Sequence, residues 1–220
     1  MQIVKMGDRL AIPSKVICVG KNYKSHIKEM GGQGTPSEPT IFLKPNSAIA
    51  NGSSSISIPS YLGLLHYEVE LCLIVGREGK NIEPSVAEAY IEGYSVGIDF
   101  TLRDVQSKAK EVGGPWTLSK GFDSAAVFGE FIPSSQVGDP LNLKIHLSVN
   151  GKVKQECNTA NMLFSPSDIL CYVSGYMTIL SGDVIMCGTP RGVGPVSDGD
   201  EIFAQIDDLP YLKFEVERKV

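Results

Sequence analysis

Short apolar runs separated by Gly, Pro and Asp dominate the chain and predict a fold with more strands than helices. Runs of this length, rich in Val, Ile, Leu and Phe, are typical of β-strands. Because strands and helices do not alternate regularly, we expect an α+β or mostly-β single domain rather than repeated βαβ units. The strands are expected at 16–20, 40–44, 67–75, 91–99, 144–149, 153–157, 184–187, 201–206 and 212–216.

Helix signals are fewer, and the clearest of them lies at 165–179. Ser165 can cap this helix, Pro166 suits its first position, and Asp168 favours its positive end. Other helices are expected at 22–30, at 101–112 and, as a turn or short helix, at 84–89.

One hairpin is predicted strongly. Apolar residues alternate with polar ones over 143–149, and Asn150–Gly151 follows at once. Both positions of an Asn-Gly turn favour positive φ, which is the geometry of a tight two-residue hairpin.

Composition and charge fit a single globular domain. The chain has 220 residues, of which 42% are hydrophobic, enough to bury a large core. We expect a short N-terminal segment, 1–15, followed by one domain, 16–220. The net charge of −5, without a basic block, argues against a nucleic-acid partner. No apolar run reaches the roughly 20 residues that span a bilayer, so no membrane role is expected.

The N-terminus and the cysteines indicate an intracellular protein. Residues 1–14 carry mixed charges and lack a signal-type apolar core, so we expect a cytoplasmic location, or a mitochondrial one if a transit peptide precedes residue 1. The five cysteines are scattered and odd in number, which predicts reduced thiols rather than a disulfide framework.

Three carboxylates form the first candidate site. Glu68 and Glu70 are two apart on a predicted strand and therefore share a face, while Asp99 ends a second apolar strand. Adjacent carboxylates beside apolar residues repel each other and lose hydration unless a cation is present. Oxygen ligands of this kind suit octahedral Mg²⁺ or Mn²⁺. The alternative is an exposed polar edge of an amphipathic strand.

His26 and Glu29 form the second candidate site. They lie three apart on a predicted short helix and can reach each other. A carboxylate orients an imidazole and raises its basicity, which makes His26 a candidate general base. Gly20 and the stretch Gly31-Gly32-Gln33-Gly34 flank the helix, as expected of a lid that closes over substrate. The alternative is a solvated helix with chance spacing.

A third group is suited to binding an anionic substrate. Arg103 and Gln106 share a predicted helical face just after Asp99, and Lys120 can stabilise an enolate or hold a carboxylate. Thr189 lies in a Gly/Pro-rich turn whose backbone N–H groups can bind a carboxylate. A surface lysine and a plain structural turn are the alternatives.

Several ordered motifs between about Val16 and Val216 together resemble the fumarylacetoacetate hydrolase family, and most closely its short acylpyruvase/oxaloacetate decarboxylase branch. The motifs are Asn22-Tyr23-x-x-His26-x-x-Glu29-Met30, Phe42-Leu43-Lys44-Pro45, His66-x-Glu68-x-Glu70, Asp99, Arg103-Asp104-Val105-Gln106, Trp116-Thr117-x-x-Lys120 and Gly188-Thr189-Pro190-x-Gly192-Val193-Gly194-Pro195.

The resemblance implies a mixed β-roll fold, a homodimer, and Mg²⁺ or Mn²⁺ held by Glu68, Glu70 and Asp99. It also implies that the His26–Glu29 dyad lies on a lid, and that Lys120 and Gln106 face the substrate. The expected reaction is hydrolysis of acylpyruvates, a class of small 2-oxo acids, with release of pyruvate through an enolate stabilised by the metal. Oxaloacetate decarboxylation is expected beside it.

Two alternatives stay open. One is an isomerase, hydratase or decarboxylase that acts on 2-oxo-ene-dioates of aromatic catabolism. The other is a non-catalytic binding protein on the same fold.

Overall fold

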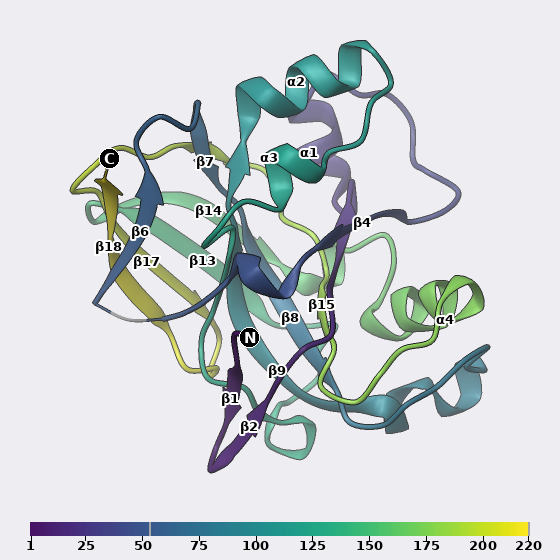
Figure 1. Ribbon diagram of the computed structural model, residues 1–220. Helices are drawn as coiled ribbons and strands as arrows, with labels where there is room; N and C mark the ends of the chain where they lie inside the picture. Colours follow the sequence, from purple (N-terminus) through teal and green to yellow (C-terminus); the bar gives the residue numbers. More distant parts are fainter. Residues whose placement is uncertain (53, 220) are drawn as a thin grey trace.

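Two β-sheets packed face to face make up most of the molecule, as the computed structural model shows for residues 1–52 and 54–219 (Figure 1). This confirms the predicted α+β class and its excess of strands. The larger sheet contains, in spatial order, β4 (Thr40–Lys44), β3 (Val16–Gly20), β15 (Val184–Met186), β8 (Val69–Val75), β9 (Ile91–Asp99), β11 (Ala126–Phe128) and β5 (Ile49–Asn51), with β12 (Ile132–Pro133) paired to β9.

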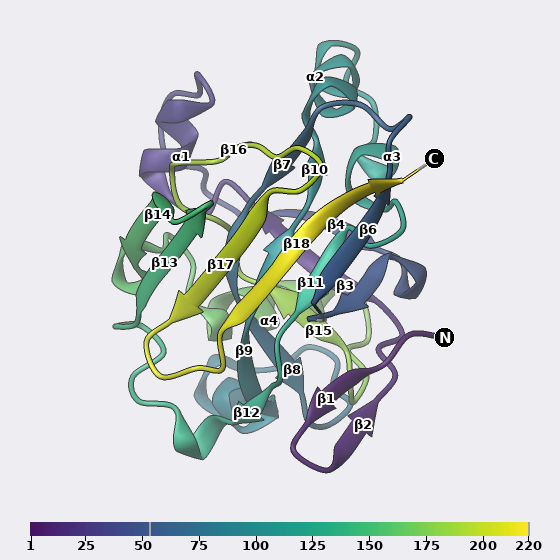
Figure 2. The ribbon, with the colours of Figure 1, turned by 90° about the vertical axis from the view of Figure 1, so that its left-hand side faces the viewer.

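The second sheet covers one face of the first. Figure 2 shows its long strands β17 and β18 nearest the viewer. The two sheets share one apolar core, in which Phe100 contacts Phe214 with ring centroids 6.2 Å apart. The strand order is β14 (Lys152–Asn158), β13 (Lys144–Val149), β17 (Glu201–Ile206), β18 (Leu212–Lys219) and β6 (Ser55–Pro59).

A third sheet, of three strands, brings together the chain segments that carry the candidate site. Its strands are β10 (Thr101–Leu102), β7 (Leu65–Tyr67) and β16 (Gly194–Pro195). His66 pairs with Thr101 on one side and with Pro195 on the other. This pairing brings the segment before Glu68, the segment after Asp99 and the Gly/Pro-rich turn together. A separate hairpin joins β1 (Val4–Met6) and β2 (Arg9–Ala11).

Of the four α-helices in the described part of the chain, three lie together at one end of the sheets, whereas α4 lies apart from them (Figures 1 and 2). The helices are α1 (Lys24–Glu29), α2 (Arg103–Glu111), α3 (Thr117–Lys120) and α4 (Pro166–Tyr176). Short 3₁₀ turns lie at Asn46–Ala48, Pro84–Tyr90, Ser134–Gln136 and Thr159–Asn161. Within the described residues, no helix is long and apolar enough to cross a membrane.

Local signals predicted several elements correctly. Five strands have the predicted bounds, namely 16–20, 40–44, 91–99, 144–149 and 201–206. Asn150 and Gly151 have φ of 50° and 71° and connect β13 to β14, as the hairpin signal predicts. Ser165 caps α4 in a reciprocal arrangement with Asp168. All five cysteines are free thiols, as predicted.

Other predicted elements have different bounds. The expected strand 67–75 is divided at Glu68, because Tyr67 pairs with Gly194 in the small sheet while Val69 pairs with Ile98 in the large one. The expected helix 101–112 begins only at Arg103, since the two preceding residues pair with β7. The helix expected at 165–179 ends at Tyr176. The short helix α3 was not predicted.

Candidate metal and substrate site

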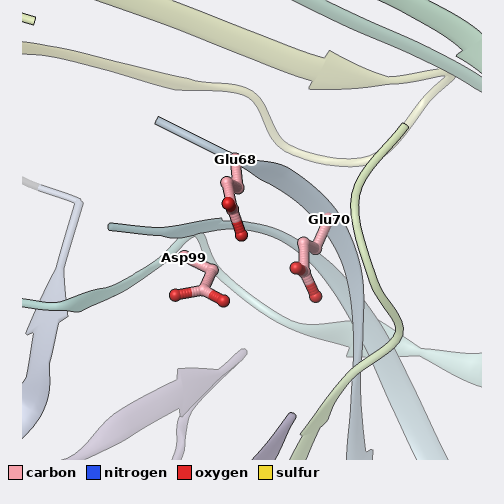
Figure 3. A group of neighbouring side chains, drawn as sticks. All are labelled: Glu68, Glu70 and Asp99. Carbon is pink, nitrogen blue, oxygen red and sulfur yellow. The ribbon is translucent and has the colours of Figure 1, made fainter. Parts of the chain in front are cut away.

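Three buried carboxylates meet where β8 and β9 lie side by side. Glu68 precedes β8, Glu70 lies on it, and Asp99 ends β9. The antiparallel register pairs Val69 with Ile98, which places the three side chains on neighbouring positions. Their ligand oxygens lie within 4.8 Å of one another, and Figure 3 shows the carboxylates turned toward a common point. The exposed polar edge considered as an alternative is therefore ruled out.

Glu70 lies in an environment that disfavours its charge. It is 2% exposed, and its Oε2 accepts one hydrogen bond, of 2.7 Å, from the Gly188 N–H. Burial, followed by the negative charges of Asp99 and Glu68, raises the pKa of Glu70 well above its ordinary value. Among the residues that the structure describes, no cationic side chain forms an ion pair with Glu70. A bound cation would remove this electrostatic cost.

Lys120 bridges the other two carboxylates. Its Nζ donates to Glu68 Oε2 at 2.8 Å, to Asp99 Oδ2 at 2.6 Å and to Thr101 Oγ1 at 2.6 Å. Burial alone would lower the pKa of Lys120, but Asp99 and Glu68 outweigh burial and raise it. The ammonium group therefore keeps its positive charge at the centre of the site.

Lys44 is a site residue that the sequence analysis did not single out. Its Nζ lies 2.7 Å from Asp99 Oδ1, and both side chains are 0% exposed. It also donates to the carbonyl oxygens of Phe100, at 3.3 Å, and Lys120. The signals in the sequence were its place in the motif Phe42-Leu43-Lys44-Pro45 and the position of a lysine at the end of an apolar strand.

The donor set fits a hard divalent cation. Asp99 Oδ1 is buried and, among the described residues, receives no hydrogen bond despite the nearby charge of Lys44. A buried carboxylate oxygen with a free lone pair is suited to metal coordination. With oxygens from Glu68 and Glu70 it forms an all-carboxylate set, which is typical of Mg²⁺ or Mn²⁺ sites.

Arg103 and Gln106 lie beside the carboxylates on the first turns of α2. Arg103 Nη1 donates to Gln106 Oε1 at 2.7 Å, and Nη2 donates to Glu68 Oε1. Burial raises the pKa of Glu68, but Lys120 and Arg103 outweigh burial and lower it below its ordinary value. Glu68 is therefore an anion held by two cations.

His26 and Glu29 form the hydrogen-bonded pair that their spacing predicts. The distance from His26 Nδ1 to Glu29 Oε2 is 3.1 Å. Glu29 Oε1 accepts a second hydrogen bond, of 2.8 Å, from the Gly192 N–H. The carboxylate thus joins α1 to the Gly/Pro-rich turn and holds Nδ1, which leaves Nε2 as the ring nitrogen available for other contacts.

One cavity of about 490 Å³ unites these groups. All the predicted site residues except Glu29 line it, and Glu29 lies behind His26. Thr189 lies in the cavity wall, and its hydroxyl oxygen accepts a hydrogen bond of 2.8 Å from Gln155 Nε2. The Gly-rich segment 31–36 also lines the cavity. The wall also contains residues that were not predicted as site residues, among them Lys21, Phe42, Lys110 and Trp116.

The chain is similar to proteins of known family over nearly its whole length. Residues 15–217 match the family described as fumarylacetoacetate (FAA) hydrolase C-terminal. The human "Oxaloacetate tautomerase FAHD1, mitochondrial" is 42% identical over 203 residues, which are 92% of this chain and 91% of the relative. The protein of the same name from Arabidopsis thaliana is 44% identical over 207 residues, or 94% and 92% of the two chains.

Solved structures show the same fold. The fumarylpyruvate hydrolase from Pseudomonas aeruginosa, in complex with Mn²⁺ and pyruvate, has a TM-score of 0.94 and 35% identity, covering 99% of this chain and 96% of its own. The 5-carboxymethyl-2-hydroxymuconate delta-isomerase from Mycobacterium smegmatis has a TM-score of 0.84 and 37% identity, covering 96% and 81%. The chain therefore belongs to the fumarylacetoacetate hydrolase family.

Proposed function

We propose that the chain is a divalent-cation-dependent enzyme that hydrolyses acylpyruvates with release of pyruvate and also decarboxylates oxaloacetate. The observation that carries the proposal is the presence, in one cavity, of a buried three-carboxylate cluster and a histidine held by a carboxylate. The similar hydrolase from Pseudomonas aeruginosa, crystallised with Mn²⁺ and pyruvate, supports both the cation and the 2-oxo acid.

Glu68, Glu70 and Asp99 would hold Mg²⁺ or Mn²⁺. The cation would supply Lewis acidity toward the carboxylate and 2-oxo oxygens of the substrate. Lys44 and Lys120 hold Asp99 in place, and Arg103 and Lys120 hold Glu68, so the ligand oxygens are positioned before any ion binds.

His26 is the proposed general base for hydrolysis. Nε2 accepts a proton from water, the water oxygen adds to the distal acyl carbonyl, and the bond between the acyl carbon and the pyruvate methylene group breaks. The bonding electrons pass to the pyruvate fragment, and His26 returns its proton to the methylene carbon. Glu29 fixes the imidazole through Nδ1 and stabilises it when it is charged.

Lys120, Arg103, Gln106 and Thr189 are proposed to bind and stabilise the substrate. Lys120 presents a permanent positive charge beside the carboxylate cluster, where negative charge develops on the 2-oxo oxygen. When oxaloacetate loses CO₂, the electrons of the broken bond likewise pass to the pyruvate fragment, and no attacking water is needed. One electron-accepting site therefore serves both reactions.

A second candidate is keto–enol tautomerisation of oxaloacetate. The observation that favours it is the similarity to the oxaloacetate tautomerases, which are 42% to 44% identical to this chain. Tautomerisation needs only a group that moves a proton between carbon and oxygen beside a stabilised enolate, and His26 can serve. Isomerisation of 2-oxo-ene-dioates also needs proton transfer beside a stabilised enolate. The similarity to the delta-isomerase from Mycobacterium smegmatis favours this reaction.

The resemblance also leads us to propose a homodimer. The names of the relatives support a mitochondrial location as the alternative to the cytoplasm.

A substrate panel separates the candidate reactions. We expect pyruvate release from acetylpyruvate and from oxaloacetate with Mg²⁺, and none with EDTA. Decay of enol-oxaloacetate absorbance without pyruvate release would instead indicate a tautomerase. Glu68→Gln should abolish cation binding, measured by calorimetry, together with every activity. Full turnover of this variant in chelated buffer would show that the cation assignment is wrong.

A further inference from the structure

One face of α2 extends the cavity away from the carboxylates. Arg103, Gln106 and Lys110 are spaced three and four residues apart, so they share a helical face, and all three line the cavity. At 1.5 Å per residue, Lys110 begins about 10 Å along the axis from Arg103. Helical side chains lean toward the N-terminus, which directs the Lys110 ammonium back toward the cavity. Lys108 is not among the lining residues.

Lys110 lies near other cationic side chains of the cavity. Its Nζ lies 5.2 Å from the centroid of the Trp116 ring, and Lys21, which follows β3 with a φ of 62°, lines the same cavity. Partial desolvation, followed by the positive charge of Arg103, lowers the pKa of Lys110, with smaller contributions from Lys120 and Lys21 and an opposing one from the Glu68 carboxylate. Across the described residues, neither Lys21 nor Lys110 forms an ion pair with a carboxylate. An anion placed between them would therefore be stabilised.

The charges at the three-carboxylate cluster balance without Lys21 and Lys110. The charges of Glu68, Glu70 and Asp99 are balanced by those of Lys44, Arg103 and Lys120. A divalent cation would then be balanced by one substrate carboxylate and the developing enolate oxygen. Lys21 and Lys110 supply positive charge that a 2-oxo acid with a neutral tail does not use.

We propose that Lys110, together with Lys21, forms a second anion subsite that binds the distal carboxylate of a 2-oxo dicarboxylate. The subsite rests on the proposed function, because it assumes that the 2-oxo acid end lies at the carboxylate cluster. Dicarboxylates long enough for the distal carboxylate to reach Lys110 would then bind tighter than acylpyruvates with uncharged tails, whereas the distal carboxylate of oxaloacetate is the group lost at the reacting bond and is not held there.

Binding measurements test the subsite without turnover. With Mg²⁺ present, calorimetry would compare pyruvate with 2-oxoglutarate, which adds a distal carboxylate. We expect wild type to bind 2-oxoglutarate more tightly. Lys110→Gln and Lys21→Gln should each weaken 2-oxoglutarate binding about fivefold, the upper range for an exposed ion pair, and leave pyruvate binding unchanged. Lys108→Gln, on the same helix but outside the cavity lining, is the matched control.

The outcomes are distinguishable. If Lys110→Gln weakens both ligands equally or neither, or if wild type prefers pyruvate, the subsite is wrong. If wild type binds neither ligand with Mg²⁺ present, the subsite and the proposed function are both wrong. If the binding pattern holds but no 2-oxo acid is turned over, the proposed reaction is wrong and the subsite stands.

Discussion

Lys44 and Asp99 form an ion pair that is closed to solvent, with Nζ 2.7 Å from Oδ1 and both side chains 0% exposed. Because Lys44 also donates to the carbonyl oxygens of Phe100 and Lys120, one ammonium joins β4 to the end of β9 and to α3. The Lys44 side chain therefore brings positive charge to the carboxylate cluster and is also buried in the core. Removing it should affect both the fold and the cation site.

Lys44→Met should destabilise the protein by about 3 kcal/mol at neutral pH, because removal of one partner leaves a buried charge poorly compensated. Urea unfolding in chelating buffer measures this change. Lys213→Ala is the matched control, since its partner Glu201, 3.3 Å away, is half exposed. The control should change stability by less than about 0.5 kcal/mol. Equal effects of the two substitutions would contradict the assigned role of Lys44.

The raised pKa of Glu70 predicts a pH dependence in the metal-free protein. The folded protein keeps the Glu70 proton above the ordinary pKa of 4.5, whereas the unfolded chain releases it. The folded state then binds more protons, so the free energy of unfolding falls as pH rises, by up to about 1.4 kcal/mol per pH unit. Glu70→Gln, which cannot ionise, should remove this contribution.

Urea unfolding with EDTA from about pH 5 to about pH 8 tests the sign. The stability of wild type relative to Glu70→Gln should decrease with increasing pH. The lowered pKa of Glu68 acts in the opposite direction, but mainly below its ordinary value of 4.5, so it contributes little to the slope in this pH range. Added Mg²⁺ should restore stability at high pH in wild type but not in Glu70→Gln. If the stability of wild type relative to Glu70→Gln instead increased with pH, Glu70 would be stabilised as an anion.

Local sequence signals predicted much of the fold and the inner site. Apolar runs gave the central strands, and the two-residue spacing of Glu68 and Glu70 placed both carboxylates at one point. The i,i+3 spacing of His26 and Glu29 gave their hydrogen bond. The helical spacing of His26 and Glu29 is carried directly by the sequence, whereas Glu68 and Glu70 converge although the strand is interrupted at Glu68.

The parts that were missed depend on residues far apart in the chain. Lys44 ends β4, which β3, β15 and β8 separate from β9 in the sheet, so its approach to Asp99 depends on the tertiary arrangement of the whole sheet. Glu29 accepts from Gly192, 163 positions later. The break at Glu68 arises because the chain moves from one sheet to another, which no local pattern encodes.

His26→Ala should reduce kcat for acylpyruvate hydrolysis roughly 10²- to 10⁴-fold, because a positioned general base contributes this much. Oxaloacetate decarboxylation, which needs no attacking water, should be reduced far less. The ratio of the two rates at saturating Mg²⁺ is the measurement. His146→Ala, outside the cavity, should leave both rates unchanged. Equal loss of both activities would mean that His26 acts on the enolate rather than on water.

Gly192 has a φ of +102°, and a Cβ at this position would overlap the carbonyl oxygen of Lys154. Gly199 has a φ of +80°, but a Cβ there would meet nothing. Gly199→Ala should therefore cost only the left-handed backbone term, about 1 kcal/mol, whereas Gly192→Ala should cost clearly more. Gly192→Ala should also lower the hydrolysis rate, because a shifted backbone moves the N–H that holds Glu29 behind His26. Unfolding and kinetic measurements on both variants test this. Equal stability losses, or an unchanged hydrolysis rate for Gly192→Ala, would show that the turn does not position the dyad.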